Sequence, residues 1–389
     1  MRSDWRAVWV VFAAGLAAGA CMSKVPPALP ALRVDLSLAI VESGFVHTVM
    51  YAVGALAGAF GGAAADRFGQ KRFALIGLAF MAAGGLAGAA APGYVVLLFS
   101  RFVEGIGFIL LTVSAAPLLV SATLPKDRPA AFSLWSCYMP TGGTLILLCA
   151  PLALATLGWR SLWIGLALYT MLCAFLLARW VPAPQFGGAI ASFRLLRESL
   201  GRPGLLLLCA GFMCYVGQWI SVMTWLPTFV VAERGAGEGA AALVTAAFVA
   251  ANIPGNLLGG LLLGLRMPRS LVMALGAAAM GASSIALLSS GVPDPLRLAA
   301  LIAFSLLGGV IPACVFSGAP LHARSAQHAG TANGMIMQAS HLSQFAVPIA
   351  VAWVATRLGG WSASLGVMLA LSFAGVLAGL GIARYERRL

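Results

Sequence analysis

A short charged loop between two long apolar runs is the feature that most constrains how this chain can fold. The first run ends at Ala65, charged residues are concentrated in 66–72, and the second run begins at Phe73. In the interior of a membrane every backbone polar group must be hydrogen-bonded within the protein, so each run can cross only as a helix. The pattern therefore predicts two membrane-spanning helices joined by a tight basic turn.

The same alternation of apolar runs and short polar loops continues along the whole chain. Of its 389 residues, 61% are hydrophobic and only 9% are charged, whereas soluble domains carry about 25% charged residues. A span needs about 20 apolar residues, so we expect an all-α integral membrane protein with twelve transmembrane helices. The expected spans begin near residues 8, 39, 72, 94, 129, 159, 204, 239, 270, 296, 329 and 361.

A long polar stretch near the midpoint predicts two six-helix halves. The expected halves are 1–181 and 204–389, joined by a cytoplasmic linker over 182–203. Internal repetition supports this division, because Pro140 and Pro348 occupy nearly the same offset in the fifth and eleventh spans. Two repeats with a site between them near the midplane are typical of alternating-access transporters.

The positive charges follow the expected topology. The net charge is +13, but only five lysines and arginines fall on one side of the predicted spans: Arg33, Arg160, Arg234, Arg297 and Arg357. Acidic residues divide almost evenly. A Lys/Arg bias without an acidic bias marks the cytoplasmic side, so we expect a multi-pass protein of the cytoplasmic (inner) membrane with both termini cytoplasmic and no nucleic-acid partner.

The charged loop also carries a family resemblance. The pattern Gly-x-x-x-Asp-Arg-x-Gly-x-Lys-Arg over 62–72 resembles the signature loop between helices 2 and 3 of the major facilitator superfamily of secondary transporters. The general look of spans 1–5 is similar to its cyanate and nitroimidazole-type permeases. The resemblance implies a monomer and a loop that latches the two halves in the outward-open state. The predicted latch residues are Gly62, Asp66, Arg67, Gly69 and Arg72; alternatively, these charges only set topology.

The resemblance also implies that helices 3, 6, 9 and 12 are outer supports and that the other eight line a cavity. The distribution of polar residues matches this division, because intramembrane polar groups concentrate in spans 1, 2, 4, 5, 7, 8, 10 and 11. A polar group that faces lipid is costly, so polar spans are expected to face protein or a water-filled path.

Three charged residues fall clearly inside predicted spans: Lys24, Arg101 and Glu104. All are expected in the outer half of the membrane, and Arg101 and Glu104 lie three residues apart on one helical face. The segment 101–107 resembles the Arg-x-x-x-Gly-x-Gly element of the family, in which the arginine is associated with proton coupling. Burial disfavours a charged carboxyl group, so Glu104 is the predicted proton-exchanging residue. Alternatively, Glu104 only neutralises Arg101 and locks the helix.

Uncharged polar residues inside the spans complete the predicted substrate site. Amide, imidazole and aromatic groups there bind a polar ligand or, alternatively, hold helices together. The predicted substrate-binding residues are Lys24, Arg101, His47, Tyr51, Gln218, Trp219, Asn252, Asn256, Gln338 and His341.

Together these features predict secondary active transport of a small solute. Two cations against one carboxylate favour a proton-coupled small anion, moved by alternating access. The alternative is an exporter of drugs or of a secreted metabolite such as a siderophore, and a membrane sensor or scaffold is a third hypothesis. The expected partners are the small-molecule substrate, protons and membrane lipid. The sequence carries no nucleophile–base set, metal cluster or phosphate loop, so we expect no cofactor and no enzymatic activity.

Overall fold

The computed structural model describes residues 3–38, 40–183, 198–235, 237–289, 291–323, 329–358 and 360–386. Within this part the chain forms helices and no strand. The α-helices are α1 (Trp5–Ser23), α2 (Val25–Asp35), α3 (Ile40–Phe68), α4 (Gln70–Ala89), α5 (Tyr94–Ala122), α6 (Arg128–Ser136), α7 (Tyr138–Leu157), α8 (Trp159–Trp180), α10 (Pro203–Arg234), α11 (Glu238–Gly264), α12 (Arg269–Leu288), α13 (Asp294–Gly308), α14 (Val310–His322), α15 (Ala329–Arg357) and α16 (Leu365–Glu386). Short 3-10 turns cover Pro125–Asp127 and Trp361–Ser364.

The helices confirm the predicted all-α membrane architecture. In the described part, eleven apolar stretches are long enough to cross a membrane, and α3 adds the shorter apolar stretch Phe45–Leu56. Each predicted start lies within a few residues of a helix start. Three predicted spans are interrupted helices, namely the pairs α1 and α2, α6 and α7, and α13 and α14.

The described helices group into two compact units. Unit 1 contains residues 1–131, 138–199 and 323–338, and unit 2 contains 132–137, 200–322 and 339–389. The main boundary falls in the predicted linker region, while two short helical segments, from the α6–α7 junction and from α15, group with the opposite unit. The six-helix halves 1–181 and 204–389 stay a prediction.

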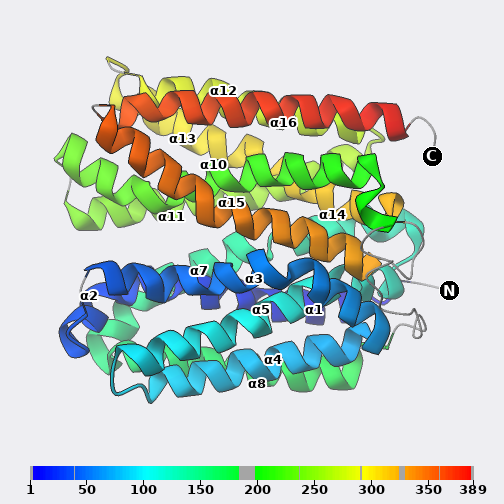
Figure 1. The fold of residues 1–389 in the computed structure, drawn as a ribbon, viewed down its shortest axis with the longest axis horizontal. Coiled ribbons are helices and arrows are strands. Elements are labelled where there is room, and N and C mark those ends of the chain that lie inside the picture. Colours follow the sequence, from blue (N-terminus) through cyan, green and yellow to red (C-terminus); the bar gives the residue numbers. More distant parts are fainter. Residues whose placement is uncertain are drawn as a thin grey trace. The chain divides into compact units, whose positions relative to one another are not determined.

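Both units use one scheme of helix neighbours, visible within each unit in Figure 1. In unit 1, α4 packs on α5 and α8, and α8 also packs on α1. In unit 2, α12 packs on α13 and α16, and α16 also packs on α10. The order of these helices along the chain is the same in the two units, so the internal repetition read from prolines in the sequence extends to packing.

Small residues allow neighbouring helices to approach backbone to backbone. A Cβ atom at Gly77 of α4 would lie 2.7 Å from the carbonyl oxygen of Gly107 in α5. In unit 2, a Cβ at Gly259 of α11 would lie 2.6 Å from the carbonyl oxygen of Val310 in α14. Close packing of this kind drives helix association in membranes. The hydrophobic effect does not drive it there, because lipid tails are as apolar as the helix surfaces.

Large apolar side chains are exposed on the helices that the sequence predicts as outer supports. On α8 these include Leu168, Leu172 and Phe175, and on α16 they include Phe373 and Leu377. In a soluble protein such an exposed apolar surface would promote aggregation. On a membrane protein it is the surface that contacts lipid.

A polar cluster joins α2, α8 and the α4–α5 loop at one end of unit 1. Trp159 Nε1 donates to Asp35 Oδ2 at 3.0 Å, and Arg160 Nη1 donates to the same oxygen at 2.5 Å. Arg160 Nη2 also donates to the carbonyl oxygen of Ala91. The hydrogen bonds from Trp159 and then Arg160 hold the pKa of Asp35 below its ordinary value.

The close approach of α4 and α5 gives a direct test of the packing. We expect Gly77→Val to destabilise the protein by about 1–3 kcal/mol, since overpacked side chains force backbone shifts. Gly165→Val is the matched control, because a Cβ at Gly165 meets nothing within 4 Å. Thermal unfolding of the detergent-purified variants measures the difference, and equal midpoints for the two would contradict the packing described here.

Candidate functional site: a buried charge cluster in unit 1

Two prolines fix the position of Lys24 in the membrane. Lys24 is the residue between α1 and α2, and α2 begins with Pro26 and Pro27 in its first turn. Proline has no backbone N–H, so the hydrogen-bond ladder of α1 cannot continue through these residues. The lysine therefore lies at a break in a spanning helix, and its side chain is only 1% exposed.

Lys24 and Arg101 share one carboxylate. Lys24 Nζ lies 2.5 Å from Glu104 Oε1, and Arg101 Nη1 forms an ion pair with Glu104 Oε2. Arg101 and Glu104 are both fully buried in α5. The predicted pairing of Arg101 with Glu104 along one helical face is present, and Lys24 joins it from another helix.

The remaining donors of Arg101 connect the cluster to α1 and α3. Nη1 also donates to the carbonyl oxygen of Cys21 at 3.1 Å, and Nε donates to the carbonyl oxygen of Val46 at 3.3 Å. Among the described residues, Arg101 Nη2 is buried without a hydrogen-bond partner. A buried guanidinium nitrogen without an acceptor costs free energy, and an anionic ligand would remove that cost.

Glycines of α4 and a tryptophan of α8 form the wall behind Glu104. Cβ atoms at Gly84 and Gly88 would lie 2.8 Å from Glu104 Cγ and 2.7 Å from Trp163 Cδ1, respectively. Lys24 Nζ lies 4.5 Å from the centroid of a Trp163 ring, within the range of a cation–π interaction. Because Gly84 and Gly88 have no Cβ, Glu104 and Trp163 can both fit beside Lys24.

Cys21, Trp163 and these glycines were not among the predicted site residues. Cys21 lies in an apolar run, and Trp163 belongs to the sixth span, which is predicted as an outer support. The one available signal was the group Gly84, Gly85 and Gly88 in the third span, which marks a face that a partner approaches closely.

His47 and Tyr51 lie on α3 beside the acceptor of Arg101. Their rings form an edge-to-face pair with centroids 5.7 Å apart. Val46, whose carbonyl accepts from Arg101, precedes His47 directly. Tyr51 is 3% exposed, and His47 Nδ1 is buried without a partner among the described residues. The structure thus places both predicted residues next to the charge cluster.

Most of the predicted residues in α10 and α11 form an uncharged network in unit 2. Tyr215 donates to Asn252 Oδ1 at 3.1 Å, and Asn256 Nδ2 donates to the same oxygen at 2.7 Å. Asn252 Nδ2 donates to the carbonyl oxygen of Ser305, whose hydroxyl accepts from Trp219 Nε1. These contacts join α10, α11 and α13, which fits the alternative that such groups hold helices together.

Gln218 also bonds within unit 2. Its Nε2 donates to the carbonyl oxygen of Cys214 at 3.1 Å, and its Oε1 accepts from the hydroxyl of Ser372 on α16 at 2.9 Å. Both polar ends of the amide are therefore used in bonds within α10 and to α16.

Gln338 and His341 of α15 belong to different units. Gln338 Nε2 donates to the carbonyl oxygen of Ala55 in α3 at 2.9 Å, within unit 1. His341 is buried in unit 2. Their roles in substrate binding stay predictions.

Part of the predicted latch lies within the described residues. Gly69 is the N-cap residue just before α4 and has a φ of 101°, a conformation that favours glycine. Arg72 is exposed, and the neighbouring Lys71 donates to the carbonyl oxygen of Ala178 at 2.8 Å. The side chains of Asp66 and Arg67 and the surroundings of Gly62 lie outside the described part of the chain, so the latch stays a prediction.

A family model and several curated proteins match the sequence. The model of the Major Facilitator Superfamily matches residues 11–348. The 3-(3-hydroxy-phenyl)propionate transporter of Escherichia coli (strain K12) is 31% identical over 202 residues, which cover 50% of this chain and 49% of that protein. The puromycin resistance protein pur8 of Streptomyces alboniger is 29% identical over 237 residues, 60% of this chain and 43% of that protein. The chain spans about half the length of these curated relatives.

Solved structures share the fold over nearly the whole chain. The proton:xylose symporter XylE superposes with a TM-score of 0.79 at 17% identity, covering 98% of this chain and 96% of that chain. The human organic anion transporter MFSD10 gives 0.80 at 15% identity, covering 97% and 100%. At these identities the likeness establishes the fold.

The shared carboxylate predicts an order of stabilities. Glu104→Gln leaves two buried cations without a counter-charge, and breaking a buried ion pair costs about 3–5 kcal/mol. Lys24→Met leaves the neutral pair of Arg101 and Glu104, so we expect a smaller loss. The readout is the thermal-unfolding midpoint in detergent.

Asp294→Asn is the control for this comparison, because it removes a carboxylate whose side chain is 69% exposed. It should change the midpoint little. A Lys24→Met protein less stable than Glu104→Gln would contradict the proposed sharing of one carboxylate by two cations.

Proposed function

Because the chain belongs to the major facilitator superfamily, we propose that it is a secondary transporter that moves a small organic anion together with protons by alternating access. The observation that carries this proposal is the contact of Lys24 and Arg101 with opposite oxygens of the buried Glu104 carboxylate. Each of the three side chains is 1% exposed or less, so their charges interact with little screening by water.

The charge balance of the cluster couples the proton to the anion. Two unit charges about 4 Å apart interact by about 4 kcal/mol at an effective dielectric of 20. The loss of the carboxylate charge therefore raises the free energy of both buried cations. A proton on Glu104 leaves Lys24 and Arg101 without a counter-charge, and an entering anion restores the balance. Each ligand therefore increases the affinity for the other, as binding linkage requires. Such co-binding favours symport.

The neighbours of the cluster favour a carboxylate attached to an unsaturated or aromatic body. Trp163 lies against Lys24, and the paired rings of His47 and Tyr51 follow Val46, which accepts a hydrogen bond from Arg101. Two relatives are in line with this chemistry, since their names specify 3-(3-hydroxy-phenyl)propionate and cis,cis-muconate. The second is the transport protein of Acinetobacter baylyi, 23% identical over 248 residues, 59% of each chain.

Drug export is the second candidate, supported by the puromycin resistance protein among the relatives. A transporter of lipophilic cations would gain nothing from Lys24 and Arg101, because like charges repel the substrate. The two candidates therefore differ in whether the buried cations are needed for transport.

We place the protein in the cytoplasmic membrane with both termini and the linker 182–203 on the cytoplasmic side. The Lys/Arg bias of the sequence supports this orientation. The loop of Gly62, Asp66, Arg67, Gly69 and Arg72 would then latch the cytoplasmic ends of the helices. A monomer surrounded by lipid is the proposed working form.

Transport by purified protein in proteoliposomes tests the proposal. Radiolabelled 3-phenylpropionate and muconate are supplied with and without an inward proton gradient. We expect the gradient to drive accumulation by the wild type. Glu104→Gln should retain exchange of labelled for unlabelled substrate yet lose at least about 90% of gradient-driven accumulation, because its proton site is gone.

Lys24→Met should weaken substrate binding about tenfold or more, the effect of losing roughly 1.4 kcal/mol of contact with the anion. Lys126→Met is the matched control, since it removes an exposed lysine and should transport like the wild type. Uptake of lipophilic cations that is unchanged in Lys24→Met, with no uptake of either acid, would overturn the anion proposal and favour export.

A further inference from the structure

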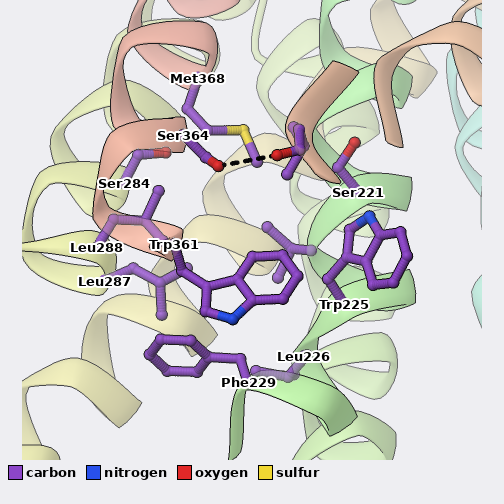
Figure 2. Close-up of a pocket in the computed structure, with 12 residues that line it drawn as sticks. Ser221, Trp225, Leu226, Phe229, Ser284, Leu287, Leu288, Trp361, Ser364 and Met368 are labelled. Carbon is purple, nitrogen blue, oxygen red and sulfur yellow. Dashed lines mark hydrogen bonds between the residues drawn. The ribbon is translucent and has the colours of Figure 1, made fainter. Parts of the chain in front are cut away.

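A cavity lies inside unit 2, lined by residues other than the predicted site residues. Figure 2 shows it between the ends of α10, α12 and α15 and the start of α16, with Trp361 extending across it toward Phe229 and Trp225. It contains about 460 Å³ of empty space, including its open mouth. We call it the Trp361 pocket, with Ser221, Trp225, Phe229, Ser284, Trp361 and Met368 as its main lining residues.

The wall of the Trp361 pocket suits an apolar occupant. Each lining hydroxyl donates to a backbone carbonyl: Ser221 to Gly217, Ser284 to Met280 and Ser364 to Val351. The indole N–H of Trp225 likewise donates to Pro348. These donors are therefore already used, and the other lining side chains are mainly aliphatic or aromatic. A hydrocarbon chain would fill this space without leaving any of these four donors unpaired.

Two arginines stand beside the pocket at Phe229. The guanidinium carbons of Arg234 and Arg297 each lie 5.9 Å from the centroid of the Phe229 ring. Asp294 pairs with Arg234 at 3.3 Å, so one carboxylate faces two cations. Arg297 is 7% exposed and donates to three backbone carbonyls, and its Nε is buried without a partner among the described residues. The surroundings of Phe229 therefore carry a surplus positive charge.

The charge pattern of the sequence makes this gathering unusual. Only five lysines and arginines were assigned to the non-cytoplasmic side, and two of them, Arg234 and Arg297, meet at this one ring. Two guanidinium groups beside one ring attract an anionic headgroup through their charge, and tryptophan is enriched at the headgroup level of both membrane surfaces.

The pocket is also next to the lipid-facing surface. Ile285 follows the lining residue Ser284 on α12 and is 49% exposed, and Leu369 follows the lining residue Met368 on α16 and is 36% exposed. On both α12 and α16 the pocket therefore lies one residue away from side chains that face the bilayer. A free aromatic acid also combines an apolar body with a negative charge. The adjoining lipid-facing surface favours an anionic lipid as the occupant.

We propose that the Trp361 pocket binds an acyl chain of an anionic membrane lipid, with the headgroup at Arg234 and Arg297. Occupation would fill the space between α10, α12, α15 and α16 and would neutralise the surplus charge. This proposal concerns unit 2 alone and does not depend on the transported substrate or on proton coupling.

Native mass spectrometry of the detergent-purified protein tests the proposal. The probes are phosphatidylglycerol and phosphatidylcholine with identical acyl chains, and 3-phenylpropionate as the free acid. We expect one phosphatidylglycerol to bind at least about fivefold more tightly than phosphatidylcholine, the effect of one arginine near the membrane surface. Arg234→Gln should abolish that preference and should fold like the wild type, because the Arg234 side chain is 35% exposed.

Filling the cavity gives the second arm. Ser284→Leu places a larger side chain in the pocket and should weaken phosphatidylglycerol binding about tenfold, as expected when a contact of roughly 1.4 kcal/mol is lost. Ile285→Phe on the neighbouring lipid-facing position is the control and should bind as the wild type does. If Ser284→Leu does not fold, Val222→Phe fills the same pocket from α10.

Fluorescence locates the bound chain. Phosphatidylglycerol with brominated acyl chains should quench the emission assigned to Trp361, obtained as the difference between wild type and Trp361→Phe, and Ser284→Leu should relieve that quenching. Equal affinity for the two lipids, quenching that Ser284→Leu does not change, or binding of 3-phenylpropionate that is lost in Ser284→Leu would each overturn the proposal.

Discussion

The sharing of one buried carboxylate by two cations is the interaction on which the organisation of unit 1 depends. Lys24 reaches Glu104 only because the prolines after it break the first span, and Arg101 reaches it from one turn away on α5. The side chain of Glu104 fits only because α4 presents Gly84 to it. A buried ion pair offsets its desolvation only when its geometry and its further hydrogen bonds are good. The helix break, the glycine face and the backbone acceptors of Arg101 supply those conditions.

The two units repeat one packing scheme but differ in chemistry. Unit 1 buries the charge cluster of Lys24, Arg101 and Glu104, whereas most of the predicted site residues of α10 and α11 in unit 2 belong to the neutral network of Tyr215, Asn252, Asn256 and Ser305. Neutral hydrogen bonds between transmembrane helices contribute modestly and change little with protonation. A charged cluster responds strongly to one proton or one ion. This contrast supports the proposal that the proton and the anion bind in unit 1 and that the amides of unit 2 mainly hold helices together.

Much of the fold could be predicted from the sequence, because the length and polarity of each apolar run determine where a spanning helix begins and ends. The rarity of charge inside spans likewise singled out Lys24, Arg101 and Glu104, and the structure brings all three together. The direct contact of Lys24 with Glu104, 80 residues away, could not be predicted. It depends on how each helix is rotated, which small residues and helix breaks set jointly. Trp163 was missed for the same reason, since its span looks lipid-facing as a whole.

One electrostatic argument applies to both proposed sites. At the charge cluster, Glu104 serves Lys24 and Arg101, and beside the Trp361 pocket Asp294 lies with Arg234 and Arg297. In each place a single carboxylate leaves one positive charge without a counter-charge. That surplus costs more at the charge cluster, whose side chains are 1% exposed or less, than beside the pocket, where Arg234 and Asp294 are 35% and 69% exposed. An anion from outside the chain lowers that cost. The cluster is enclosed by protein and suits a small solute, while the pocket adjoins the lipid-facing surface and suits a molecule that is itself part of the membrane.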